Sequence, residues 1–242
     1  MSGHSKWHNI QVRKGKQDKL KANAFTKVGR LITIAARQGG GDPNMNFSLR
    51  LAIEKAKEVN FPKENIDRAI KKGTGGGEEN NLEEIVYEGF GPGGIGVLVD
   101  VLTDNKNRTA PEMKHIFSQF GGSLAGPGAV KWQFIQKGVV HIGVVEKQKI
   151  ADQDVFELAL IEAGADDIET HDFGVEIYTP VDKFQTTLEA VKKLGITPSD
   201  PGIEWVAKET LPVDEPTSEK MAELYDALDG LDDVRSVYTN EA

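Results

Sequence analysis

The chain has 242 residues and a formal net charge of −9, from 38 acidic and 29 basic residues, and it has no cysteine. The absence of cysteine excludes disulfides, thiolate catalysis and cysteine-based zinc sites, and it suits a reducing cytosol. The most apolar stretch, 95–102, is broken by Asp100 and too short to span a bilayer, and the first residues lack the apolar segment of a secretory signal. We therefore expect a cytoplasmic protein without a membrane partner, and its length favours two or three small domains.

The charge is divided unevenly along the chain. Residues 1–75 contain 16 basic and 6 acidic residues, a net charge of +10, whereas the remainder contains 13 basic and 32 acidic residues, a net charge of −19. Such an asymmetry indicates a partner of opposite charge at one end of the molecule. Nucleic acid is the expected partner, because lysine and arginine neutralise phosphates in contacts that do not depend on base sequence.

The predicted binding residues lie in an N-terminal arm and in the helix that follows it. The arm, 2–15, has no periodicity and is expected to be mobile. From Lys16 onward, apolar residues recur at steps of three and four and the basic residues repeat on the opposite side, where their charge is expected to be free for a partner. A solvated helix face is the alternative, but such a face normally mixes signs. The predicted nucleic-acid-binding residues are Lys6, Trp7, His8, Arg13, Lys14, Lys16, Lys19, Lys21, Lys27, Arg30 and Arg37.

Trp7 and His8 add a feature that charge alone does not give. An aromatic ring beside basic residues can stack on an unpaired base. Trp7 could equally dock on the folded body. His4 and His8 have a spacing of four, but no third ligand lies near them, so no metal site is predicted there.

The elements of the first 75 residues are predicted to be three short helices, which together make a small bundle. The first runs from Lys16 to the glycines 39–41, the second over 46–59 until Pro62 interrupts the pattern, and the third over 63–72. The Gly- and Asn-rich stretch 73–81 is a linker by composition and coincides with the change in charge.

The rest of the chain alternates strands and helices, a rhythm that fits split βαβ, ferredoxin-like units. The expected fold class is α+β multidomain: an N-terminal three-helix bundle followed by two ferredoxin-like α/β domains, one inserted in the other. Strands are predicted at 85–87, 95–103, 130–135, 139–144, 167–170, 175–178, 203–211 and 234–239, and helices at 111–120, 152–163, 181–194 and 216–228. The predicted domains are 1–78 (basic arm and bundle), 79–134 with 206–242 (one α/β domain) and 135–205 (the inserted domain).

Two loops of the first α/β domain carry motifs. The stretch 91–96 is formally G-x-G-x-x-G, but it leads into a strand rather than a helix, so a tight turn between strands is predicted instead of a dinucleotide site. Between a predicted strand and helix, Lys106 and Arg108 are rare positive charges in an acidic domain. They are candidates for a second anion contact. Capping of the helix by Asn107 or Thr109 explains the same loop equally well.

No catalytic residue, cofactor or set of metal ligands is predicted. Adjacent carboxylates on loops are usually solvated surface, and His115, His141 and His171 belong to no nucleophile pattern. The sequence therefore favours a protein that is not an enzyme.

Four segments together resemble the YebC/PmpR family, which also includes a mitochondrial translational activator of cytochrome oxidase. The segments are 3–7 (GHSKW), 39–43 (GGGDP), 87–94 (YEGFGPGG) and 103–109 (TDNKNRT). The resemblance covers essentially the whole chain. It implies a helical bundle with two α/β domains, one inserted in the other, in a non-enzymatic cytoplasmic protein. Family members are commonly described as DNA-binding transcriptional regulators, and others act in translation.

Two functions remain open at this point. The first is a DNA-binding transcriptional regulator, although no clear helix-turn-helix and no zipper for a dimer is found, so a monomer is expected. The alternative is a ribosome-associated translation factor that contacts ribosomal RNA or tRNA and relieves stalling on proline-rich stretches. A basic arm with Trp and His suits irregular RNA with unstacked bases at least as well as duplex DNA.

Overall fold

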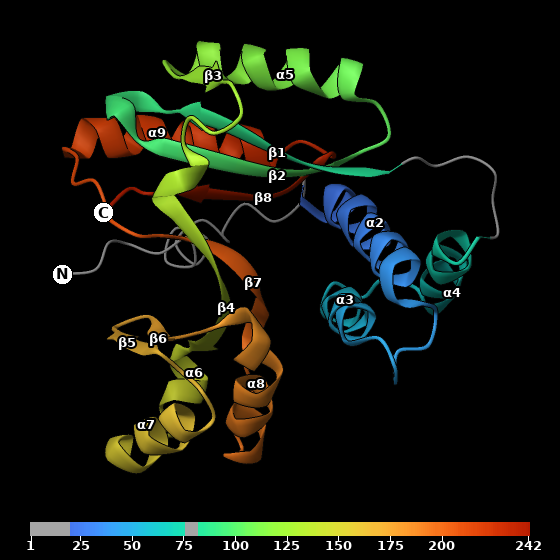
Figure 1. The fold of residues 1–242 in the computed structure, drawn as a ribbon, viewed down its shortest axis with the longest axis vertical. Helices are drawn as coiled ribbons and strands as arrows, with labels where there is room; N and C mark the ends of the chain where they lie inside the picture. Colours follow the sequence, from blue (N-terminus) through green and yellow to red (C-terminus); the bar gives the residue numbers. More distant parts are fainter. Residues whose placement is uncertain (1–19, 76–81) are drawn as a thin grey trace.

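The structure, a computed structural model, describes residues 20–75 and 82–242. Helices α2 (Leu20–Gly39), α3 (Phe47–Glu58) and α4 (Lys63–Gly73) come first, and two four-stranded antiparallel sheets with their helices follow (Figure 1). This arrangement confirms the α+β fold class expected from the sequence. Within the two described ranges, no helix has both the length and the apolar character needed to cross a membrane.

The three helices form a bundle with a small core. Asn46 is the N-cap of α3: its side-chain oxygen accepts the backbone N–H of Leu49 at 3.0 Å, and its amide donates to the carbonyls of Ala35 and Gly40. One buried side chain thus fixes the end of α2 to the start of α3. The buried apolar residues of the bundle are Val28, Ile32, Ala35, Ala36, Leu49, Ala52, Ala56, Ile66 and Ala69.

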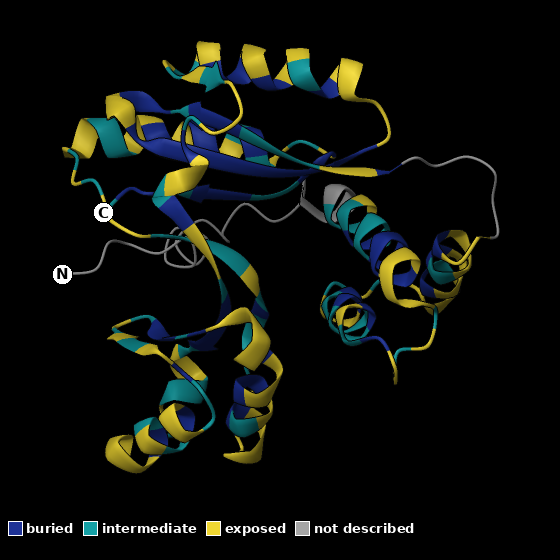
Figure 2. Ribbon diagram, viewed as in Figure 1, coloured by how far each residue is buried: buried dark blue, intermediate teal, exposed yellow. Residues whose placement is uncertain are grey.

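The first sheet has the strand order β3-β1-β2-β8, with β1 (Glu83–Phe90), β2 (Gly96–Thr103), β3 (Ser123–Ala125) and β8 (Val234–Thr239). Every residue of β2 is buried, which Figure 2 shows as a continuous dark strand. Alternate valines of β2 pack against α5 (Lys106–Gln119) and α9 (Glu215–Asp229) on one face of the sheet. On the other face Leu98 meets the connection to the second sheet and Leu102 meets Ile34 of α2.

The glycine-rich segment 91–96 is the turn between β1 and β2, as predicted. It contains a short 3-10 helix, η1 (Pro92–Gly94), after which the chain enters β2 and pairs with the strand it has just left. Gly93 and Gly94 have φ values of +70° and +79°, a region that favours glycine. The phosphate-binding interpretation of this motif fails, because no helix of more than one turn begins here.

The second sheet is built from one continuous segment of the chain, 134–207. It has the order β5-β6-β4-β7, with β4 (Phe134–Gly143), β5 (Asp167–His171), β6 (Gly174–Thr179) and β7 (Ser199–Ala207). Its helices are α6 (Val144–Lys147), α7 (Gln153–Glu162) and α8 (Phe184–Lys193), the last preceded by η3 (Val181–Lys183). After β7 the chain returns through α9 to place β8 beside β2, so the second sheet interrupts the first. The second unit has the βαββαβ connectivity of the split βαβ fold, whereas in the first unit β1 precedes the βαβ elements.

The sequence prediction was wrong about β4, β3 and the start of α5. The two strands predicted at 130–135 and 139–144 are one strand, β4, preceded by η2 (Lys131–Gln133). Gly138, between the two predicted strands, lies inside β4, where a Cβ atom would come within 2.6 Å of the Phe184 ring. The glycine lets α8 approach the strand and does not make a turn. The three-residue strand β3 carried no signal, and α5 begins five residues before Pro111.

Glu88 holds the connection between the two sheets. This residue is 4% exposed, and its carboxylate accepts the backbone N–H groups of Gly128, Val130 and Lys131 at 2.6–2.7 Å. Burial acts to raise the pKa of Glu88, but these three hydrogen bonds outweigh it and leave the pKa below its ordinary value. The negative charge is therefore part of the folded arrangement.

Replacing Glu88 with glutamine should lower the free energy of unfolding by about 2 kcal/mol, because an amide oxygen accepts less strongly and its NH2 faces donors. Urea denaturation at pH 7 measures this change. Glu112→Gln, an exposed change on α5, is the matched control and should stay within about 0.5 kcal/mol of the parent. Equal urea midpoints for the two variants would show that the Glu88 carboxylate does not stabilise the fold.

The bundle contacts both α/β units. Phe47 and Leu51 of α3 pack against the core of the second unit, and the ring of Phe47 meets Phe184 edge-on at a centroid distance of 5.8 Å. Lys55 pairs with Asp200 at 2.5 Å.

Candidate nucleic-acid interface

The structure describes the predicted binding residues to different extents. Seven of them lie outside the described residues, and for Lys21 the structure describes the helix but not the side chain. Lys27, Arg30 and Arg37 are fully described. The seven outside the described ranges are Lys6, Trp7, His8, Arg13, Lys14, Lys16 and Lys19.

Lys27 and Arg30 face the first α/β unit and not solvent. The Lys27 ammonium donates to the backbone carbonyl of Asp229 and lies 3.1 Å from its carboxylate, and the Lys27 side chain is 18% exposed. Arg30, 21% exposed, donates to the Asp233 carboxylate at 2.6 Å and to the carbonyls of Leu102 and Asp232. The expectation that this helix face is free for a partner is therefore wrong for these two residues, because an acidic surface of the same chain already covers them.

The Asp233 carboxylate accepts hydrogen bonds both from α2 and from the first α/β unit itself. This side chain, 5% exposed, also accepts from Arg108 at 2.8 Å and from the hydroxyls of Thr109 and Thr103 at 2.7 and 3.1 Å. Burial acts to raise the pKa of Asp233, but the hydrogen bonds from Arg108, Thr109 and Arg30 prevail and lower it to about 2. One carboxylate thus joins α2 of the bundle, the start of α5 and the loop before β8.

The proposed second anion contact has carboxylate partners within the chain. Arg108 binds Asp233 and, at 3.1 Å, Asp104, while Lys106 is paired with Glu83. The helix is capped by Asn105, whose side chain accepts the N–H of Arg108. The capping prediction that named Asn107 or Thr109 was wrong, since Thr109 instead donates to the Asn105 carbonyl or the Asp233 carboxylate.

An exposed basic surface remains on the bundle, mostly from residues that the sequence prediction missed. Arg68, Lys71 and Lys72 follow one another at steps of three and one on α4, and all are exposed. Arg37 is exposed at the end of α2, where Gly73 of α4 packs on its backbone, and its guanidinium donates to the carbonyl of Leu82 at 3.3 Å. We call Arg37, Arg68, Lys71 and Lys72 the basic surface. The excess of basic residues in 1–75 was the sequence signal that could have identified Arg68, Lys71 and Lys72.

The acidic half of the chain lines a cavity of about 810 Å³ between the two α/β units. Tyr178, Trp205 and Tyr238 contribute aromatic walls. Burial, and after it the charges of neighbouring carboxylates, raises the pKa of Tyr178 far above its ordinary value. A lining with six carboxylates and two lysines repels phosphate, so nucleic acid is not expected to enter here. The carboxylates are Asp167, Glu169, Glu176, Glu204, Glu209 and Glu241.

Comparison with known proteins gives a consistent assignment over nearly the whole chain. A family model described as the TACO1/YebC protein N-terminal domain matches residues 5–76, and one described as the TACO1/YebC second and third domain matches 82–241. A probable transcriptional regulatory protein of Fusobacterium nucleatum is 49% identical over 241 residues, which cover 99% of this chain and 95% of that protein. One of Thermoanaerobacter pseudethanolicus is 48% identical over 240 residues, covering 99% and 96%.

A solved structure agrees with these matches. The crystal structure of a conserved hypothetical protein from Aquifex aeolicus superposes with a TM-score of 0.86 at 38% identity, over 95% of this chain and 93% of that one. The family that the sequence motifs suggested is thus confirmed by both domain models and by full-length relatives. This chain belongs to the TACO1/YebC family.

Proposed function

We propose that this chain is a non-enzymatic regulator of gene expression that binds nucleic acid through its N-terminal domain, as a DNA-binding transcriptional regulator. The observation that carries the proposal is the separation of charge, +10 in residues 1–75 against −19 in the rest. Relatives named as probable transcriptional regulatory proteins support the regulatory part.

The contacts of α2 reduce the set of basic residues that we expect to bind phosphates. Lys27 and Arg30 are already paired with carboxylates, so their charge is compensated within the chain. The basic surface, the arm and the other lysines and arginines of residues 1–75 carry the remaining positive charge of the N-terminal domain. Lysine and arginine at these positions hold phosphates without reading bases, so the contacts position the protein on its target.

The alternative is a ribosome-associated translation factor, and one observation favours it. The exposed side of α4 presents Arg68, Lys71 and Lys72, three cations close together that can meet the phosphates of a folded backbone. A surface of this kind suits the irregular backbone of folded RNA as well as duplex DNA. The acidic α/β units would then face solvent or protein.

Sedimentation of a cell lysate through a sucrose gradient at low salt separates the two functions. A transcriptional regulator should remain in the slowly sedimenting fractions, apart from ribosomal particles. The same protein should protect a specific site in promoter DNA in a footprinting experiment. A translation factor should co-sediment with ribosomal particles after DNase treatment and be released by RNase. In either case, binding should fall steeply with salt, with a log–log slope of about −4 to −8. A chain that stays free in the gradient and binds neither DNA nor RNA at low salt would contradict the proposal.

A further inference from the structure

The open face of the second sheet carries charged side chains that the strand register brings together. Residues directly opposite each other in an antiparallel pair share a face, and Glu169 of β5 lies opposite Glu176 of β6, which in turn lies opposite His141 of β4. His171 is two residues beyond Glu169, so it points to the same side. This is the face that lines the cavity between the α/β units, and the helices of the unit cover the other face.

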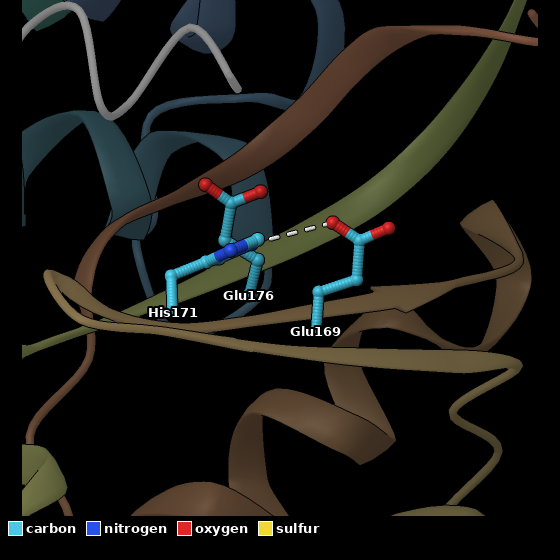
Figure 3. Close-up of side chains that lie close together, drawn as sticks. All are labelled: Glu169, His171 and Glu176. Carbon is cyan, nitrogen blue, oxygen red and sulfur yellow. Dashed lines mark ion pairs between the residues drawn. The ribbon is translucent and has the colours of Figure 1, made fainter. Parts of the chain in front are cut away.

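Three of these side chains lie close together (Figure 3). One ligand atom from each of Glu169, His171 and Glu176 lies within 4.8 Å of the other two, and the carboxylate of Glu169 is 3.3 Å from Nε2 of His171. Four ligands at zinc–ligand distances of ~2.0–2.2 Å in a tetrahedron are ~3.3–3.6 Å apart, so only a small rotation of the side chains is needed to close the set.

The state of His171 is a second observation that points to a ligand. Its Nε2 atom is buried and, among the described residues, has no partner in hydrogen-bonding geometry, although the Glu169 carboxylate lies 3.3 Å away as an ion pair. The imidazole ring is held in place by stacking on Phe173, with centroids 4.7 Å apart and planes within 8° of parallel. A buried, oriented imidazole nitrogen directed at carboxylate oxygens is the arrangement that a borderline-soft divalent cation requires.

We propose that this face binds one divalent transition-metal ion, of the Zn²⁺ or Mn²⁺ type, through Nε2 of His171 and carboxylate oxygens of Glu169 and Glu176. Glu176 is completely buried, and Tyr178 donates a hydrogen bond of 2.5 Å to its second oxygen, which orients the carboxylate as outer-shell partners of metal ligands do. The remaining coordination positions open to the cavity, where water can fill them. No sequence motif predicts this set, because a spacing of two and then five residues across a hairpin matches no familiar arrangement of metal ligands.

The test uses the full chain after treatment with a chelator and dialysis. Titration with ZnCl2 and with MnCl2, followed by calorimetry, should give one ion per chain for at least one of the two metals, and MgCl2 should bind at least about tenfold more weakly because imidazole does not suit it. At a metal concentration of about 100 times Kd, the melting temperature should rise by about 5 °C. His171→Ala and, separately, Glu176→Gln should each abolish the stoichiometric binding and the thermal shift.

Two control variants test whether metal binding depends on His171 and not on other histidines of the chain. His115→Ala removes an exposed histidine on α5 and should leave binding unchanged. His4→Ala with His8→Ala removes the N-terminal histidine pair and should also leave it unchanged. Glu176→Gln retains the shape of the side chain and relieves the repulsion from Glu169, so the variant should fold at least as stably as the metal-free parent. The absence of binding to either metal, or binding that survives His171→Ala, or binding that is lost with His4 and His8, would overturn the proposal.

Discussion

Replacing Asp233 with asparagine is expected to lower the free energy of unfolding by about 3 kcal/mol, the largest loss of stability that we predict for a single substitution. The change leaves Arg30, which is 21% exposed, and Arg108, which is half-exposed, without their shared anion, so the loss lies at the lower end of the ~3–5 kcal/mol that removing one partner of a buried ion pair costs. Urea denaturation measured by circular dichroism at pH 7 gives the value. Asp232→Asn is the matched control, since that side chain is exposed and only its carbonyl contacts Arg30.

The pH dependence of stability provides an independent readout of the same carboxylate. The pKa of Asp233 is about 2 in the folded protein against an ordinary value of 3.8. A depressed pKa contributes stability that is present above about pH 4 and is lost as the pH falls toward 2, a contribution of about 2 kcal/mol. The parent should therefore lose more stability between pH 4 and pH 2 than Asp233→Asn does. Parallel pH profiles for the two proteins would show that Asp233 is not held ionised by its partners.

The contacts around Asp233 also show why the sequence predicted the helices better than the surroundings of the basic side chains on α2. Helical periodicity located the end of α2 and both ends of α3 and α4 to within a few residues, because each helix buries one apolar face. The fate of Lys27 and Arg30 depends on carboxylates about 200 residues away, which only tertiary structure brings near. A periodic pattern indicates which side of a helix is polar, but it does not indicate whether solvent or another domain covers that side.

The errors in the α/β units have the same physical origin. The sequence predicted separate strands at 130–135 and 139–144, yet β4 runs through Gly138, whose lack of a side chain leaves room for the Phe184 ring. Glu169, His171 and Glu176 are unremarkable in sequence, since their proximity is a property of strand register and not of spacing. Local signals therefore identified the family and fold class, while the contacts that decide which charges face solvent came from long-range packing.

Reversing the charge of the α4 side of the basic surface is expected to weaken nucleic-acid binding by more than about tenfold. The variant Arg68→Glu/Lys71→Glu/Lys72→Glu replaces three exposed cations that make no ion pair within the described part of the chain. If each meets a phosphate in the complex, the slope of log K against log salt should fall in magnitude by about 2 to 3. Fluorescence anisotropy with labelled duplex DNA and with labelled structured RNA, at several salt concentrations, measures both quantities.

The control for this variant changes the same amount of charge elsewhere. Lys114→Glu/Lys193→Glu/Lys220→Glu reverses three exposed lysines of the α/β units and lowers the net charge equally. This control should alter affinity by less than about threefold and should leave the salt slope unchanged, because it removes only long-range attraction. If the two triple variants weaken binding to the same degree, the basic surface does not contact the phosphates and net charge alone governs association. A variant of Lys27 and Arg30 should instead lose stability, since those cations hold the bundle against the acidic unit.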